Sequence, residues 1–67
     1  MSPTEIAERL TRLGYRRSET KDRTEIWVNP QTGTAAAIDS TQPTIGTETL
    51  NRFLERLQIS WPEFEAA

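Results

Sequence analysis

The chain has 67 residues, which is enough for one small, marginally stable domain spanning residues 1–67. It contains no cysteine and no histidine. This composition excludes disulfides, thiolate chemistry and the side chain that most often acts as general base or metal ligand at neutral pH. No apolar run is long enough to span a membrane and no signal peptide opens the chain, so a soluble, cytoplasmic protein is expected.

The first predicted element is a helix over residues 3–13. Ser2 can cap its start, and Ile6 and Leu10 lie one turn apart on a single apolar stripe. Gly14 can adopt the left-handed conformation that commonly ends a helix.

Three strands are predicted next, over residues 15–20, 24–29 and 34–39. The second strand alternates β-branched and other side chains, a pattern typical of a half-buried strand. Residues 29–33 contain proline and glycine and supply the turn into the third strand. The three strands are therefore expected to form an antiparallel meander with the second strand in the middle.

The expected hairpin pairs Ile26 with Ile38 and Val28 with Ala36 on the buried face. Trp27 then lies on the opposite, open face of the sheet. In that position its indole could stack on a base or anchor a protein partner. The alternative interpretation is that Trp27 lies flat on its own sheet and shields the central strand.

A second helix is predicted to follow the loop at residues 40–46, with Thr47 as its cap. A short terminal turn starts at Ser60, and its Trp61 and Phe64 are expected to fold back on the second helix or the sheet edge.

The order αβββα predicts an α+β fold in which two helices cover one face of a three-stranded antiparallel sheet and leave the other face open. The expected core consists of Ile6, Leu10, Leu13, Tyr15, Ile26, Val28, Ala36, Ile38, Leu50, Phe53, Leu54, Leu57 and Ile59.

Positive charge is concentrated between Arg9 and Arg23. This window carries a net charge of +4 and the remainder carries −6, within a total of −2. Such segregation is typical of a surface that binds phosphate or an acidic partner, although a solvated face near a helix end is an equally good explanation. The candidate RNA- or partner-binding residues are Arg16, Arg17, Lys21, Arg23 and Trp27.

The remaining polar residues do not indicate a site for a metal or cofactor. The acidic residues form no cluster at a recognisable ligand spacing. The three glycines are scattered and form no phosphate-binding loop. We therefore expect no metal and no small-molecule cofactor.

Several short motifs occur in an order that is typical of one protein family. They are Leu13-Gly14-Tyr15, Ile26-Trp27, Asn29-Pro30, Gly33, Thr49-Leu50, Gln58-Ile59-Ser60 and Phe64. In this order they resemble the HicA family of bacterial mRNA interferase toxins, also called YcfA-like. The resemblance implies a double-stranded-RNA-binding-like αβββα fold and, in an intact toxin–antitoxin pair, a HicB-type protein partner.

The sequence departs from the family at the catalytic residue. The family's Gly-Ser-His motif falls on Asp22-Arg23-Thr24, so that Thr24 replaces the histidine. A threonine hydroxyl is too weak an acid or base without an activating partner. Glu19, Asp22 or Glu25 would act as a base only with a raised pKa, and an arginine-rich loop keeps carboxylates ionised.

Three functions remain consistent with the sequence. The first is a HicA-like domain that binds RNA, a HicB-like antitoxin, or both, without cleavage. The second is an active mRNA interferase that works through a substituted site. The third is a protein-interaction module that uses the open sheet face or an edge strand. The acidic overall charge favours the first and the third.

Overall fold

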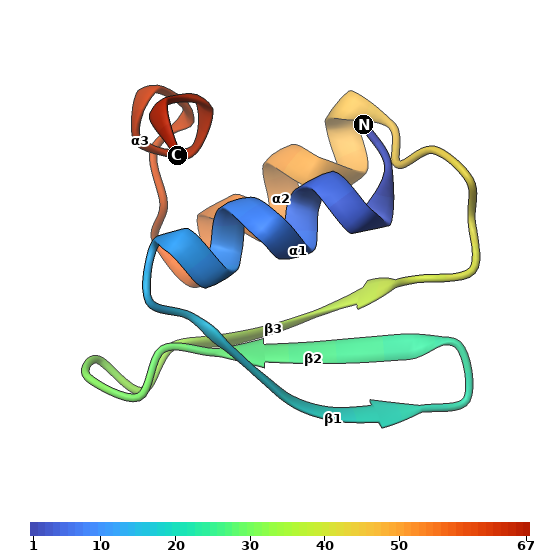
Figure 1. Ribbon diagram of the computed structural model, residues 1–67, viewed down its shortest axis with the longest axis horizontal. Coiled ribbons are helices and arrows are strands. Elements are labelled where there is room, and N and C mark those ends of the chain that lie inside the picture. Colours follow the sequence, from blue (N-terminus) through green and yellow to red (C-terminus); the bar gives the residue numbers. More distant parts are fainter.

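A computed structural model describes residues 1–67 as an α+β fold. The elements are α1 (Pro3–Arg12), β1 (Arg16–Lys21), β2 (Thr24–Val28), β3 (Ala35–Asp39), α2 (Thr47–Leu57) and α3 (Trp61–Ala66). The strands form one antiparallel sheet in the order β1-β2-β3, and α1 and α2 lie on the same face of it (Figure 1). The predicted αβββα arrangement is confirmed, with α3 as a short additional helix. No helix is both long enough and apolar enough to cross a membrane.

Local signals explain where α1 begins and ends. The Ser2 hydroxyl accepts a hydrogen bond from the Glu5 backbone N–H at 3.2 Å, which satisfies one of the free donors at the helix start. Gly14 follows the last turn with a φ of +90°, as expected for a residue that ends a helix. The start of α2 differs from the prediction, because Gly46 occupies the cap position without a side-chain bond and Thr47 is already helical.

The hairpin between β2 and β3 is closed by a loop at residues 29–34, with Asn29 bonded to Thr34 across its base. The Asn29 N–H donates to the Thr34 carbonyl at 2.9 Å, and the Gly33 N–H donates to the Asn29 carbonyl at 2.8 Å. The Asn29 side chain also accepts from the Gln31 N–H at 2.9 Å, and Gly33 adopts a φ of +78°. These bonds shift the register of the whole hairpin by one residue.

The shifted register reverses the two faces of β2. Trp27 pairs with Ala36, so that Trp27 turns toward the helices and is only 2% exposed. Ile26 and Val28 are half-buried on the open face, and their predicted place in the core is wrong. A one-residue slip has this effect because successive side chains of a strand alternate between the two faces. Burial of the indole removes more apolar surface from water than burial of either aliphatic side chain would.

The core lies between the sheet and the helices. Its buried apolar residues are Ile6, Leu10, Tyr15, Trp27, Ala36, Ile38, Ile45, Leu50, Phe53, Leu54, Leu57, Ile59 and Phe64. Leu13 was predicted to be buried but is only partly so, whereas Ile45, in the loop before α2, is buried although it was not predicted. Ile45 is held in place because its N–H donates to the Met1 carbonyl at 2.7 Å.

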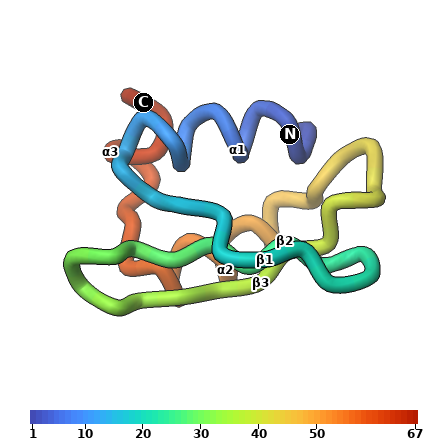
Figure 2. The backbone as a smooth tube through the Cα atoms, turned by 60° about the horizontal axis from the view of Figure 1, so that its bottom comes forward, coloured from blue at the N-terminus to red at the C-terminus, as the bar shows by residue number.

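The helix α3 lies beside the C-terminal end of α1 (Figure 2). The Arg9 guanidinium donates to the carbonyls of Phe64 and Glu65 at 3.1 and 3.0 Å, and its carbon lies 5.4 Å from the Phe64 ring centroid. The Trp61 indole N–H donates to the Asn51 side chain of α2 at 2.8 Å. The prediction that Trp61 folds back on the second helix is confirmed.

Candidate functional site

The predicted binding residues of β1 are divided between the two faces of the sheet. β1 is an edge strand whose residues are all exposed, and an irregularity at Ser18 interrupts its pairing with β2. Arg17 pairs with Trp27 and lies on the helix-facing side, whereas Arg16 and Glu19 lie on the open face. Arg16 and Arg17 therefore do not share a surface.

Arg17 connects the sheet edge to the core. Its Nη1 lies 3.2 Å from Oε2 of Glu25, and its guanidinium carbon lies 5.4 Å from the Trp27 ring centroid. The side chain of Glu25 is 10% exposed, whereas that of Arg17 is 52% exposed. A buried carboxylate is costly unless it is paired, and a cation over an indole face is attracted to the ring. Arg17 thus compensates Glu25, covers Trp27 and still presents its outer half to solvent.

Trp27 does not project from the open face, and that prediction is wrong. The indole is buried under the helices, so it presents no ring to a nucleic-acid base or to a protein. The other aromatic side chains are also unavailable, because Tyr15, Phe53 and Phe64 are buried and the Trp61 indole N–H is bonded to α2. The open face therefore carries no aromatic stacking platform.

Thr24, which the sequence resemblance aligns with a catalytic histidine, lies in a row across the open face between Lys21 of β1 and Asp39 of β3. Asp39 Oδ1 accepts from the backbone N–H of Thr41 at 2.9 Å and from its hydroxyl at 2.7 Å. The backbone bond, then the hydroxyl bond and last the charge of Arg23 lower the pKa of Asp39 below its ordinary value of 3.8. A general base works best with a pKa near the operating pH, so Asp39 is poorly suited to activate Thr24.

The remaining basic candidates lie near the turn between β1 and β2. Lys21 and Arg23 are both exposed there, but the acids Glu19, Asp22 and Asp39 lie among them in the sheet and turn. The turn is tight, since Asp22 adopts a φ of +57°. The positive charge is therefore interrupted by negative charge and forms no continuous basic surface.

The rest of the basic window is engaged within the fold. Arg9 is bonded to α3, and Arg12 donates to the Ala67 carbonyl at 2.9 Å. The basic residues of the window that form neither an ion pair nor a side-chain hydrogen bond are Arg16, Lys21 and Arg23.

The centre of the open face is aliphatic. Ile26 pairs with Ala37 and Val28 pairs with Ala35, which places the four side chains next to one another. Both alanines are exposed and the two larger residues are half-buried. The charged residues of the open face, which border this aliphatic centre, are Arg16, Glu19, Lys21 and Asp39. Their charges cancel, so the surface is apolar in the middle and neutral overall.

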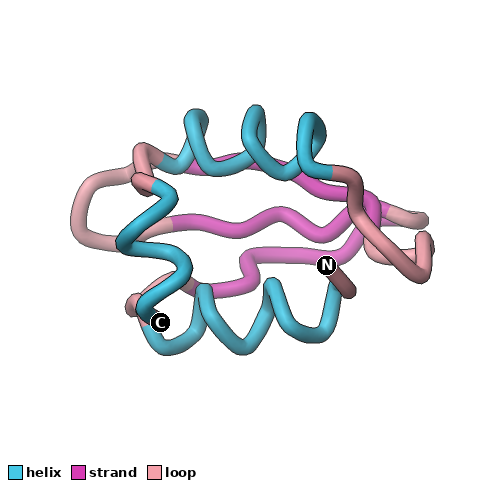
Figure 3. The backbone as a smooth tube through the Cα atoms, turned by 90° about the horizontal axis from the view of Figure 1, so that it is seen from above, coloured by secondary structure: helices cyan, strands magenta, loops and turns pink.

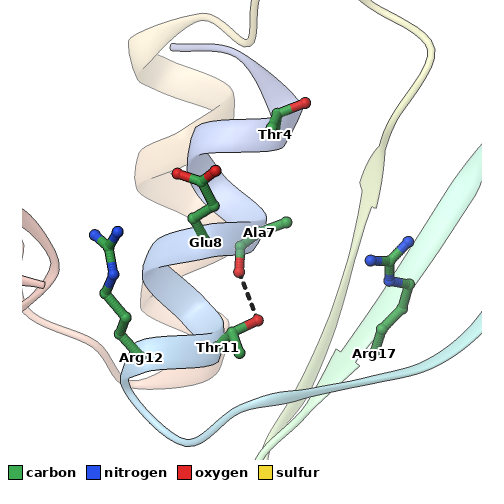
Figure 4. Close-up of a pocket in the computed structure, with 6 residues that line it drawn as sticks. All are labelled: Thr4, Ala7, Glu8, Thr11, Arg12 and Arg17. Carbon is green, nitrogen blue, oxygen red and sulfur yellow. Dashed lines mark hydrogen bonds between the residues drawn. The ribbon is translucent and has the colours of Figure 1, made fainter.

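A groove of about 460 Å³ lies between α1 and β1 on the helix side of the sheet. The residues that line it are Thr4, Ala7, Glu8, Thr11, Arg12 and Arg17 (Figure 4). A second hollow of about 240 Å³ shares Thr4, Ala7 and Arg17 with it and extends to Glu25 and Ser40. Pockets for small molecules are mostly apolar, whereas Ala7 is the one apolar residue of this lining.

The groove was not predicted from the sequence. Thr4, Ala7 and Thr11 recur at helical spacing and form one strip of short side chains on α1. This spacing is visible in the sequence, but the predicted contacts of the helix concerned only its apolar stripe. The width of the groove also depends on where α1 lies, and Figure 3 shows α1 outside β1 when the sheet is seen from above.

The structure contains no group of three or more histidine, cysteine, aspartate or glutamate side chains placed to hold a metal ion. No family model matches the chain, and no curated protein matches it. Its function is therefore inferred from the geometry of the open face and the groove.

Proposed function

We propose that this chain is a HicA-like domain that binds a HicB-like protein partner through the open face of its sheet, without cleaving RNA. The observation that carries the proposal is the aliphatic centre formed by Ile26, Val28, Ala35 and Ala37. No element of the chain covers it, because α1 and α2 lie on the other face. An uncovered apolar patch with a polar rim is typical of a protein-binding surface.

RNA is the second candidate ligand, and it is favoured by the unpaired side chains of Arg16, Lys21 and Arg23. Proteins that bind single strands usually combine a positively charged groove with exposed aromatic rings. The open face has neither, since its charges cancel and its aromatic neighbour Trp27 is buried. These properties favour a protein over RNA as the main ligand.

Cleavage of RNA is the least supported activity. The hydroxyl of Thr24 has no histidine near it, because the chain contains none. The carboxylate in its row, Asp39, is held ionised by Thr41 and has a lowered pKa. With its pKa lowered, Asp39 is a poor general base for Thr24 at neutral pH.

The proposal is tested with a charge placed in the aliphatic centre. Ala37 is exposed, so Ala37→Glu should leave the fold intact while it buries a charge in any complex that uses this face. We expect the affinity for a purified HicB-like protein to fall at least tenfold by calorimetry. The matched control is Ala66→Glu, an exposed position on α3 that should leave the affinity unchanged.

The same samples separate the two ligand classes. Amide signals of β2 and β3 should shift with the HicB-like protein and change little with single- or double-stranded RNA. An affinity for RNA above that for the protein, lost on addition of salt, would overturn the proposal. Equal affinity of the Ala37→Glu variant and the parent protein would show that the partner binds elsewhere.

A further inference from the structure

The outer edge of β1 is free to pair with another strand. Because the Asn29 N–H donates to the Thr34 carbonyl, Asn29 turns its backbone groups toward β3. Backbone groups alternate between the two sides of a strand, so Thr24, Ile26 and Val28 turn theirs toward β1. Through the pairing of β1 with β2, Arg17 and Thr20 then turn their backbone N–H and C=O groups away from the sheet. The sheet has no strand beyond β1 to receive them.

The helix α1 lies near this edge, on the helix side of the sheet. Seen from above, α1 runs outside β1 and along it (Figure 3). A fourth strand would lie about 4.8 Å beyond β1, on the side of the sheet along which α1 runs. Every second side chain of such a strand would point into the groove of about 460 Å³, where Thr4, Ala7 and Thr11 are short enough to leave room.

The charges around this edge define the chemistry of the occupant. Arg17 exposes half of its side chain at the groove, and Arg12 lines the same groove with Glu8 as the one acid. The six residues that line the groove carry a net charge of +1, from the two arginines and Glu8. Carboxylates on an added strand would form charge-assisted hydrogen bonds with these guanidinium groups. A second β1 strand, itself basic, would place like charges opposite each other.

The irregularity at Ser18 limits how long the added segment can be. A bulge in an edge strand interrupts regular pairing and discourages long, flat strands. A short segment can still pair at Arg17 and Thr20 on either side of Ser18.

We propose that the groove between α1 and β1 binds a short, acidic, extended segment of a protein, which adds to the sheet beside β1. This inference rests on the proposed function, because the acidic segment would belong to the same protein partner. The groove lies on the opposite side of the sheet from Ala37, so binding at the groove and binding at the open face are tested separately.

The test uses two synthetic peptides of alternating residues, one of threonine and glutamate and one of threonine and lysine, with blocked termini. In titrations of the intact chain followed by NMR, we expect the glutamate peptide to shift the amides of Arg17 and Thr20 and to slow their hydrogen exchange. The lysine peptide should bind at least tenfold more weakly, and added salt should weaken the binding of the glutamate peptide.

Two substitutions at Thr11 provide a matched pair, since this residue is exposed. Thr11→Phe fills the groove and should abolish binding of the glutamate peptide, whereas Thr11→Val keeps the volume and should retain it. Arg17→Gln should weaken binding at least tenfold, with near-ultraviolet circular dichroism as the check that the core remains folded.

Several results would overturn the inference: equal binding of both peptides, equal binding to the Thr11→Phe and Thr11→Val variants, or shifts confined to Ile26 and Ala37. If the glutamate peptide fails to bind while Ala37→Glu still impairs binding of the HicB-like protein, strand addition is wrong and the proposed function stands. If the peptide binds and the HicB-like protein does not, the groove is confirmed and the open-face proposal is wrong.

Discussion

Arg17 and Glu25 form an ion pair at the border between the groove and the core, with 3.2 Å between Nη1 and Oε2. The pair explains how a carboxylate is accommodated on the helix-facing side of β2, next to Trp27. It also means that the residue proposed to receive an acidic segment already has one carboxylate partner. A guanidinium has five N–H donors, so Arg17 retains donors for a second carboxylate on its exposed side.

The first prediction concerns the free energy of unfolding. Arg17→Leu leaves Glu25 without its partner and should lower the free energy of unfolding by about 1–3 kcal/mol. Urea denaturation followed by tryptophan fluorescence measures this change. The control is Arg52→Leu, which breaks the exposed ion pair with Glu48 and should cost no more than about 0.5 kcal/mol.

A double variant separates the pair from other roles of Arg17. Arg17→Leu combined with Glu25→Leu replaces both charges by apolar groups and should recover most of the lost stability. If Arg17→Leu lowers the free energy of unfolding no more than Arg52→Leu does, Arg17 does not stabilise the buried Glu25 carboxylate. The explanation of how Glu25 is accommodated would then be wrong.

The second prediction concerns the burial of Trp27. In a Trp61→Phe background, Trp27 is the one tryptophan, and its emission should be shifted to short wavelength and resist quenching by acrylamide. Trp27→Ala should destabilise the fold by about 3–5 kcal/mol, which is a large part of the stability of so small a domain. Efficient quenching of Trp27 in the folded protein would show that its indole is exposed, as predicted from the sequence.

The contrast between α1 and β2 shows what could be predicted from the sequence. The start and end of α1 follow from Ser2 and Gly14, which act on their own neighbours. In β2 both alternations are compatible with a strand, one burying Ile26 and Val28 and the other burying Trp27. The choice depends on how the loop closes, through the bond between Asn29 and Thr34, and on the pairing of Glu25 with an arginine of the neighbouring strand.

The candidate sites illustrate the same distinction. The basic window was visible in the sequence, but its division between α3, the ion pair and the open face depends on tertiary contacts such as the bond from Arg12 to Ala67. The groove is set by the position of α1 relative to β1, and no local pattern determines that position. The open face itself was predicted correctly, although with the wrong residues of β2 on it.

The third prediction concerns Asp39 and pH. Because the folded state holds the pKa of Asp39 below 3.8, its stabilising contribution is present above the unfolded pKa of about 3.9. That contribution is lost as the pH falls through the lower, folded pKa. Titration of the Asp39 carboxyl carbon by NMR should show this lowered pKa directly.

The substitution Thr41→Val removes the hydroxyl bond to Asp39 but keeps the backbone bond. The pKa of Asp39 should therefore rise toward 3.8 without reaching it. Thr44→Val, in the same loop, is the control and should leave the titration unchanged. An unchanged pKa in the Thr41→Val protein would show that the hydroxyl bond does not contribute.

The fourth prediction concerns catalysis. The purified protein should leave RNA intact at near-neutral pH over hours, because Thr24 has no activating base and Asp39 in its row is held ionised with a lowered pKa. Thr24→His is the informative variant, since it places an imidazole in the row between Lys21 and Asp39, and it is expected to introduce weak cleavage. Gel analysis of a labelled transcript compares the two proteins, with Thr24→Val as the control that removes the hydroxyl alone. Cleavage by the parent protein that persists through repurification and treatment with a chelator would show that the chain is an active interferase with a base other than histidine.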